Sequence, residues 1–502
     1  MPASTKFFSL CLLSLSALLL SVQPLAAGLR AGVAKVDITN YEAGPVNDPL
    51  YVKALVITDE TTTVVIATVD AVSLGEIGYI KNDYLGKVRA ELQKDLKIPP
   101  AHVIINASHC HGIVCPDVAP RTVKAVEQAH KNLVPVKVKA GVGEEKRVGE
   151  NRRLKLKNGK EADVRHAYSL PPDSEVAGIG PIDPEIGLLR LDTADGKPLA
   201  VLYNFACHPI QGVPSGGNTA DYVAFASKVI EDNFEGALAL FLQGCGGDIN
   251  PVQYKDPDNP RNAEQHGNLL GLSAMRALHK IPGTETGPLK VINEKLDLPR
   301  ADLTDKIEAN QAEIDRLVNS LNGTSLNFKT FLPLYIKHKA SGDYPGYYSH
   351  RYMHDKLIGR EDMQKLDAQN RKNLDDYLAN IQTMENITRV RTNLALLKMH
   401  QAQNVAAGKR TIEVEIVGIR IGDFVLLTFP GELTVQIGLN IKGKAPHELT
   451  FVAGYTNGYI YYCPTAEQLK NVGGAQEDSD CLLAPEWQAV FEKKAAEILQ
   501  KL

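Results

Sequence analysis

Strand-helix-strand order, with short loops between the elements, is the feature that most constrains how this chain can fold. Residues 64–70 form a β-branched apolar run typical of a buried strand, residues 79–97 have apolar positions at helical spacing, and residues 103–105 are again Val-Ile-Ile. The same order recurs between residues 199 and 242. Such βαβ units favour a parallel or mixed sheet. We therefore predict an α/β fold with a mixed β-sheet core and flanking helices.

Metal-ligand side chains follow several of the predicted strands. The second strand of the first unit leads to His109 and His111, and the first strand of the second unit leads to His208. A Gly-rich loop with Asp248 follows that unit's last strand, and a later strand leads to Glu432. Open α/β sheets bind ligands at the carboxyl ends of their strands, and two imidazoles with a carboxylate are a common catalytic zinc set. The alternative is hydrogen-bonded loop histidines, with Glu432 at a helix N-terminus.

The composition excludes some classes of function. The 502 residues are 44% hydrophobic and 23% charged, which is ordinary for a globular chain, and the formal net charge is only -4. Nucleic-acid binding would require a basic face, and the chain contains no long run of like charge. We therefore expect no nucleic-acid partner. The sequence leaves the oligomeric state open.

The N-terminus predicts export. Lys6 precedes an apolar run that ends at Leu20, and residues 25–27 (Leu-Ala-Ala) offer a small-residue cleavage site, which is the pattern of a signal peptide. The apolar run is too short for a convincing membrane span, and no later segment approaches about 18 uninterrupted apolar residues. We predict a signal peptide at residues 1–27, no transmembrane segment, and a mature protein that is secreted or periplasmic.

Residues 303–403 differ in character from the rest of the chain. They contain long polar-rich segments with helical periodicity, such as residues 307–321 and 361–397. We predict a helical insertion packed on the sheet, either as part of a lid or as a solvated helical hairpin without a function. Strand patterns resume at residue 411, so residues 28–502 are expected to form one catalytic domain that contains this insertion.

Six cysteines remain after the predicted cleavage. Export permits disulfides, and Cys463 with Cys481 is a plausible pair. Cys110, Cys207 and Cys245 stand beside the histidine and aspartate motifs, and their spacing matches no zinc-ribbon pattern. We interpret them as small buried residues or as bridges near the site.

Six short motifs stand in a fixed order along nearly the whole predicted mature chain. They are Ala107-Ser108-His109-Cys110-His111-Gly112, Glu150-Asn151-Arg152, Asn204-Phe205-Ala206-Cys207-His208, Gly247-Asp248-Ile249-Asn250-Pro251, Pro430-Gly431-Glu432-Leu433 and the segment 454–462. Together they resemble the neutral/alkaline, non-lysosomal ceramidase family, whose members hydrolyse the amide bond of ceramide with a zinc-bound water. The resemblance implies a Zn2+ cofactor held by His109, His208, Glu432 and Tyr462, with the neighbouring tyrosines as alternatives to Tyr462.

The resemblance also implies roles for three further residues. His111 and Arg152 match positions that contact the reacting amide, where a guanidinium can stabilise an oxyanion and His111 can donate or shuttle a proton. The alternative for Arg152 is an ordinary surface arginine. Asn250 takes the place of the family's serine, and its amide can hold a water or the substrate but cannot act as a nucleophile. We keep all three as candidate catalytic residues.

Two other departures from the family bear on the substrate. Ala475 stands where the family has a tyrosine, and the resemblance stops before the family's C-terminal β-sandwich domain. We therefore expect a divergent member that lacks this domain. Catalytic metal chemistry is better supported by these motifs than ceramide is as the substrate.

Three functions are compatible with the motifs. The favoured one is a secreted zinc-dependent amidohydrolase that acts on an N-acyl lipid or a related amide. The alternative keeps the metal but takes a more polar amide or ester, such as a cell-wall or glycan fragment. The third is a non-enzymatic binding protein, against which the complete set of ligand-type residues counts. A long apolar groove beside the metal would favour an acyl chain, and a narrow polar pocket would favour the alternative.

Overall fold

Two β-sheets form the centre of the molecule, and the larger has eight strands in the order β12-β11-β10-β5-β1-β2-β3-β4. These strands are β1 (Arg30–Asp37), β2 (Tyr51–Thr58), β3 (Thr63–Val69), β4 (Val103–Ala107), β5 (Val134–Glu144), β10 (Glu185–Thr193), β11 (Pro198–Phe205) and β12 (Leu238–Gln243). The predicted signal peptide lies outside the part of the chain that the computed structural model describes. The described residues are 28–164, 170–254, 256, 258–282, 287–340 and 349–502.

The two predicted βαβ units are confirmed at opposite ends of this sheet. α1 (Tyr84–Leu96) connects β3 to its parallel neighbour β4, and α3 (Tyr222–Asn233) connects β11 to its parallel neighbour β12. The other neighbouring strands are antiparallel, so the sheet is mixed, as expected. Only Arg30 and Ala31 of β1 pair with β5. The sheet therefore consists of two four-stranded halves that meet at a corner.

A second sheet, in the order β14-β15-β16-β18, shares an apolar core with the larger one. Its strands are β14 (Leu289–Pro299), β15 (Thr411–Ile421), β16 (Phe424–Thr428) and β18 (Thr450–Ala453). Because successive side chains of a strand point to opposite faces, Leu55 and Ile419 contribute to the core between the sheets, whereas Val56 belongs to a core under the helices. Fully burying such a side chain contributes roughly 1.5–3 kcal/mol.

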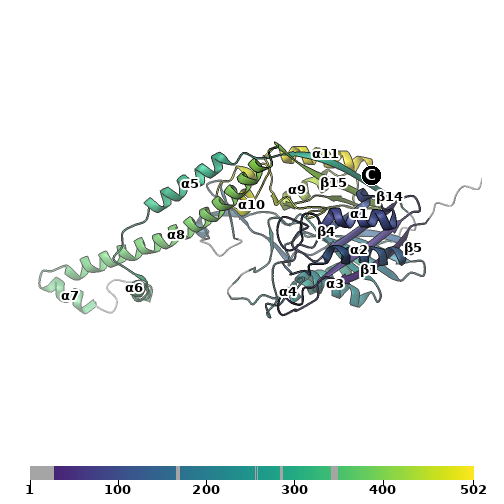
Figure 1. Cartoon of the computed structure of the whole chain (residues 1–502). Helices are drawn as coiled ribbons and strands as arrows, with labels where there is room; N and C mark the ends of the chain where they lie inside the picture. The colour runs from purple at the N-terminus through teal and green to yellow at the C-terminus, as the bar shows by residue number, and fades with distance from the viewer. Residues whose placement is uncertain (1–27, 165–169, 255, 257, 283–286, 341–348) are drawn as a thin grey trace, which may run out of the picture.

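Helices cover the outer face of each sheet, which gives the molecule four layers (Figure 1). α1 and α2 cover one half of the larger sheet, α3 and α4 cover the other half, and α9 and α11 cover the smaller sheet. In α1, Tyr84, Val88 and Leu92 are buried at four-residue spacing, which is why this segment forms an amphipathic helix. The bounds of the other covering helices are α2 (Val118–Lys131), α4 (Ala263–Leu278), α9 (Val435–Lys444) and α11 (Trp487–Lys501).

The helices of the predicted insertion are confirmed, and they join β14 to β15. The expectation that the whole insertion packs on the sheet is wrong for its outer part, where few residues of α8 are buried. The insertion consists of α5 (Thr304–Asn319), α6 (Phe328–Ala340), α7 (Ser349–Leu357) and α8 (Asp362–Ala406). At 1.5 Å per residue the 45 residues of α8 span about 68 Å. Most buried residues of α8 lie between Arg389 and Asn404. The rest of α8 projects from the sheets with α6 and α7 as an arm (Figure 1).

Short elements set the positions of the loops around the site. They are β6 (Gly149–Asn151), β7 (Arg153–Leu156), β8 (Glu161–Asp163), β9 (Val176–Ile179), β13 (Ile249–Pro251), β17 (Glu432–Leu433), β19 (Tyr462–Cys463) and α10 (Gln476–Ser479). β6 pairs with β13, and β17 pairs with β19. Among the helices of the described residues, none is long and apolar enough to cross a membrane.

The disulfide considered for Cys463 and Cys481 is not formed. Both thiols are free and buried, and so are those of the other four cysteines in the described part of the chain. The sulfur of Cys463 contacts the carbonyl oxygen of Tyr461, and that of Cys481 contacts the carbonyl oxygen of Leu483, each at 3.7 Å. The cysteines are therefore small buried residues, which was one of the two interpretations of their spacing.

Candidate metal centre and cavity

The ends of distant strands meet at the candidate site. Five strands separate β4 from β11 in the sheet order, so strand pairing does not explain why the ends of these two strands lie close together. The buried amide of Asn106, at the end of β4, makes the connection. Its Oδ1 accepts the backbone N–H of Gln243 at 3.0 Å, and its Nδ2 donates to the carbonyl oxygen of Gly454 at 2.8 Å. The loops that follow β4, β12 and β18 are thereby held together.

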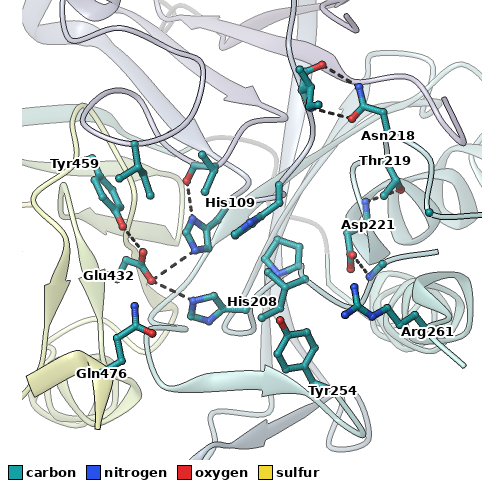
Figure 2. A pocket seen from close by; sticks show the side chains of 18 of the residues that line it. His109, His208, Asn218, Thr219, Asp221, Tyr254, Arg261, Glu432, Tyr459 and Gln476 are labelled. Carbon is teal, nitrogen blue, oxygen red and sulfur yellow. Dashed lines mark hydrogen bonds and ion pairs between the residues drawn. The ribbon is translucent and has the colours of Figure 1, made fainter. Parts of the chain in front are cut away.

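Three of the sequence-predicted ligand residues come together at this point. His109, His208 and Glu432 each offer one ligand atom within 4.8 Å of the others. The Oε2 atom of Glu432 lies 3.1 Å from Nε2 of His208 and 3.6 Å from Nε2 of His109. All three side chains are buried (Figure 2). This is the only such group of three or more His, Cys, Asp or Glu residues found in the described part of the chain.

Backbone carbonyls orient both imidazoles. Nδ1 of His109 lies 2.6 Å from the carbonyl oxygen of Val72, and Nδ1 of His208 lies 3.0 Å from that of Ile249. A carbonyl oxygen only accepts, so each Nδ1 carries the hydrogen and each Nε2 keeps a lone pair directed at the centre. Such a hydrogen bond is the usual partner of a metal-ligating histidine.

Burial keeps the two imidazoles neutral. It lowers the pKa of His109 to about 4 and also lowers the pKa of His208. For Glu432, burial raises the pKa, but the neighbouring His109 and His208 and the hydrogen bond from Tyr459 outweigh it, so the pKa lies below its ordinary value. The centre therefore offers two neutral nitrogen ligands and one carboxylate at neutral pH, which is a donor set suited to zinc.

Tyrosines of the 454–462 segment surround the carboxylate. The hydroxyl of Tyr459 donates to Oε1 of Glu432, and that of Tyr455 donates to Oε2 at 3.1 Å. The hydroxyl of Tyr462 lies 3.4 Å from Nε2 of His208. The structure thus places Tyr462 beside the centre, while Tyr455 and Tyr459 fix both oxygens of the carboxylate. Sequence reasoning did not find these two contacts, although all three tyrosines belong to one motif.

Arg152 is a buried cation and not a surface arginine. Its guanidinium donates to Oε1 of Glu477 at 2.6 Å, to the carbonyl oxygen of Gly247 at 2.7 Å and to Oδ1 of Asn250 at 3.2 Å. Burial lowers its pKa, but Glu477 and the nearby Tyr462 raise it well above its ordinary value. The guanidinium lies 5.5 Å from the centre of the Tyr462 ring. The site therefore has a fixed positive charge.

Two candidates from the Gly-rich loop serve as supports in this arrangement. Asn250 is buried and holds the guanidinium of Arg152, and it is not among the residues that line the cavity. Asp248 accepts the backbone N–H of Val435 at 2.7 Å, at the start of α9, and the side-chain amide of Asn151 at 3.1 Å. Asp248 therefore fixes α9 and β6 relative to one another.

Further site residues that the sequence did not reveal lie in α10. Glu477 binds both Arg152 and Arg153, and Asp478 binds Arg153 at 2.9 Å. Gln476 lines the cavity, and its buried Oε1 has no hydrogen-bond partner among the described residues. The available signal was the pairing of a double arginine with a Glu-Asp dipeptide. The arginine pair and the Glu-Asp dipeptide lie far apart in the sequence, so there was no reason to connect them.

A cavity of about 800 Å3 opens beside the centre, and His111 and Arg152 both line it. His111 is exposed, with its ring 5.7 Å from that of His109. One wall is polar and includes Asn218, Thr219 and Arg261, which Figure 2 shows across the cavity from Glu432. Apolar residues, namely Val72, Ile77, Ile113, Ile210, Leu396 and Met399, also line the cavity. The cavity is thus neither a purely apolar groove nor a purely polar pocket.

Comparison with known proteins identifies a shared fold. No protein-family model matches the sequence, and no curated protein matches it. The neutral ceramidase from Pseudomonas aeruginosa is similar in structure, with a TM-score of 0.59, 16% identity, and coverage of 95% of this chain and 75% of that chain. A ceramidase complexed with C2 gives the same TM-score and identity, with coverage of 94% of this chain and 75% of that chain. The chain therefore has the fold of the neutral ceramidase structures.

Proposed function

We propose that this chain is an exported, zinc-dependent amidohydrolase that cleaves the amide bond of an N-acyl lipid. The observation that carries the proposal is the buried group of His109, His208 and Glu432 at the edge of a large cavity. The shared fold of the neutral ceramidases and the motifs of the sequence support the same function. The proposal treats residues 28–502 as one catalytic domain with a helical insertion.

The donor atoms fit a catalytic zinc ion. His109, His208 and Glu432 would hold it, with Tyr462 as a fourth ligand, because its hydroxyl lies beside Nε2 of His208. Zinc bound there would polarise a carbonyl group and lower the pKa of a water ligand towards about 7. The hydrogen bonds of Tyr455 and Tyr459 to Glu432 would keep the carboxylate in place.

The surrounding side chains suit amide hydrolysis. The fixed charge of Arg152, next to Tyr462, favours negative charge on an oxygen at the reacting carbon. His111 is exposed to the cavity and is our candidate for giving a proton to the leaving amine. Asn250 acts as a positioning residue because it holds Arg152. Gln476 lines the cavity, and a rotation of its side chain would offer its unpaired Oε1 to a substrate N–H or hydroxyl group.

Metal binding and activity test the proposal together. We expect the purified protein to contain one zinc per chain by elemental analysis and to release fatty acid from ceramide or from short N-acyl amides. A chelator should remove both the metal and the activity, and added zinc should restore them. His109→Ala should lose both, because it removes a buried ligand. The control is His279→Ala, at the exposed C-terminal end of α4, which should keep both.

Absence of a stoichiometric divalent metal from the folded wild-type protein would contradict the proposal. So would full activity of the folded His109→Ala variant. The same assay separates the acyl-lipid substrate from a polar one. The polar wall with Arg261, Asn218 and Thr219 favours an anionic or hydroxylated amide as the second candidate. Faster turnover of short N-acyl sugars or N-acyl amino acids than of ceramide would select it.

A further inference from the structure

Two exposed apolar stripes lie on the arm. On α6, Phe328, Leu332 and Ile336 follow one another at four-residue spacing and are 65%, 42% and 56% exposed. On α7, Met353 and Leu357 have the same spacing and are 74% and 82% exposed. Residues four apart lie on the same face of a helix. Each helix therefore presents a continuous apolar stripe to solvent.

The stripe on α6 is additional to the face that holds α6 on the arm. Phe331 is buried, and its ring stacks on Tyr335 of α6 and on Tyr377 of α8, with ring centres 5.5 Å and 4.5 Å apart. These contacts already attach α6 to α8. Phe328, Leu332 and Ile336 are not needed for that packing, so the exposed stripe calls for another explanation.

The arm tip, defined as α6 and α7, is basic on a chain of negative net charge. α6 contains Lys329, Lys337 and Lys339 and no carboxylate, and α7 contains two basic residues against one aspartate. The whole chain has a formal net charge of -4. Two copies of a basic tip repel one another, whereas an anionic surface attracts each of them. The charge therefore argues against self-association through this face.

We propose that the arm tip docks on the surface of an anionic phospholipid bilayer. Exposed aromatic and aliphatic side chains with flanking lysines are the composition of helices that lie in a membrane interface. The stripe of Phe328, Leu332 and Ile336 would enter the headgroup region, and α7, which like α6 packs on α8, would add Met353 and Leu357 as a second contact. The lysines of α6 would bind phosphate groups while their aliphatic stems cover apolar surface.

The docking surface is separate from the candidate metal centre. Leu396 of α8 lines the cavity, and α6 packs on Tyr377, which lies 19 residues earlier in the same helix, a distance of about 29 Å. The proposal therefore goes beyond the hydrolase function and does not depend on it. A chain with no activity could still bind membranes, and a soluble hydrolase could fail to bind them.

Vesicle co-sedimentation tests the proposal with the full chain. We expect wild-type protein to bind vesicles of equal parts phosphatidylglycerol and phosphatidylcholine, and to bind pure phosphatidylcholine at least about fivefold more weakly. Raising the salt concentration should weaken binding to the anionic vesicles. The triple variant Leu332→Ser, Ile336→Ser and Leu357→Ser should lower the partition coefficient at least about tenfold.

A matched triple variant controls for the general loss of exposed apolar side chains. Ile179→Ser, Leu272→Ser and Val405→Ser remove three side chains that are 60%, 52% and 69% exposed and lie outside the arm tip. This variant should bind vesicles as the wild type does, and circular dichroism should show that both variants are folded. A wild type that stays in the supernatant would overturn the proposal, as would equal losses in both variants. Dimers that dissociate only in the tip variant would identify a second copy as the occupant.

Discussion

Asp70 shows, at the scale of one residue, how burial changes the ionisation of a polar group in this fold. It directly follows β3, where its Oδ2 accepts the backbone N–H of Tyr51 at 2.9 Å. Burial raises its pKa to about 6 from the ordinary 3.8, although the nearby Lys53 lowers it. The proton is therefore bound more tightly in the folded chain than in the unfolded one.

The free energy of unfolding should fall as the pH rises from about 4 to about 6. In this window the folded chain keeps the proton of Asp70 and the unfolded chain has lost it, so each step in pH costs stability, up to about 3 kcal/mol in total. Asp70→Asn removes this titration. The stability of the variant relative to wild type should rise across the window in urea unfolding experiments.

Asp195→Asn is the matched control for this experiment. Asp195 is exposed, and the hydrogen bond from Thr193 lowers its pKa instead of raising it. Its effect on the pH dependence should be small and of the opposite sign. A difference between Asp70→Asn and wild type that stays constant from pH 4 to pH 7 would contradict the assignment.

At the scale of elements, buried amides hold the strand ends together. Asn106 links β4 to β12 and to the loop after β18, and Asn204 of β11 donates to the carbonyl oxygens of Leu242 and Val452 at 3.0 Å and 3.2 Å. The hydrogen bonds of Asn106 to Gln243 and Gly454, and of Asn204 to Val452, join strand ends that are not paired with one another. The loops that carry the candidate ligands His109 and His208 follow the strands that these bonds fix.

Replacing Asn106 should therefore loosen the whole site. Asn106→Leu preserves the approximate shape but leaves the N–H of Gln243 buried without this partner and removes the donors to the carbonyl of Gly454 and to the hydroxyl of Thr456. We expect a loss of about 3 kcal/mol or more in the free energy of unfolding, measured in urea. Asn233→Leu, an exposed amide on α3 that donates only to its own helix, should cost less than about 0.5 kcal/mol. Equal costs would show that Asn106 does not hold the strand ends.

The sequence was informative for elements with local patterns and not for long-range contacts. The βαβ units were predictable because the spacing of apolar residues is a local property. His109, His208 and Glu432 were found because each follows a predicted strand. The connection from Asn106 to Gln243 spans 137 residues, and the partnership of Arg152 with Glu477 spans 325. No local pattern encodes either, so their contribution to the site became apparent only in three dimensions.

At the scale of the whole molecule, α8 belongs to two environments. Between Arg389 and Asn404 it packs on the body of the protein, where Arg389 donates to the carbonyl oxygens of Asp163 and Gly474 at 2.8 Å and 3.1 Å. Before residue 386 only Asp367 and Leu374 of this helix are buried. The helical periodicity predicted the helices of the insertion, but it did not predict that half of α8 leaves the body of the protein.

Hydrogen exchange should divide α8 at this boundary. Helix stability in a protein comes mainly from tertiary packing, so amides between residues 362 and 385 should exchange at least about tenfold faster than those between 389 and 404. Mass spectrometry of peptic peptides can measure this difference in the native protein. Uniform protection along α8 would mean that the arm is held by contacts other than those described.

The helical insertion begins and ends at one place on the smaller sheet. Pro299, at the end of β14, is paired with Thr411, at the start of β15. The two strands therefore form a hairpin, and the connection between them contains four helices. The outer part of this insertion can be lengthened, shortened or replaced without altering the register of any strand. The register of the strands therefore leaves the length and composition of the arm free to differ.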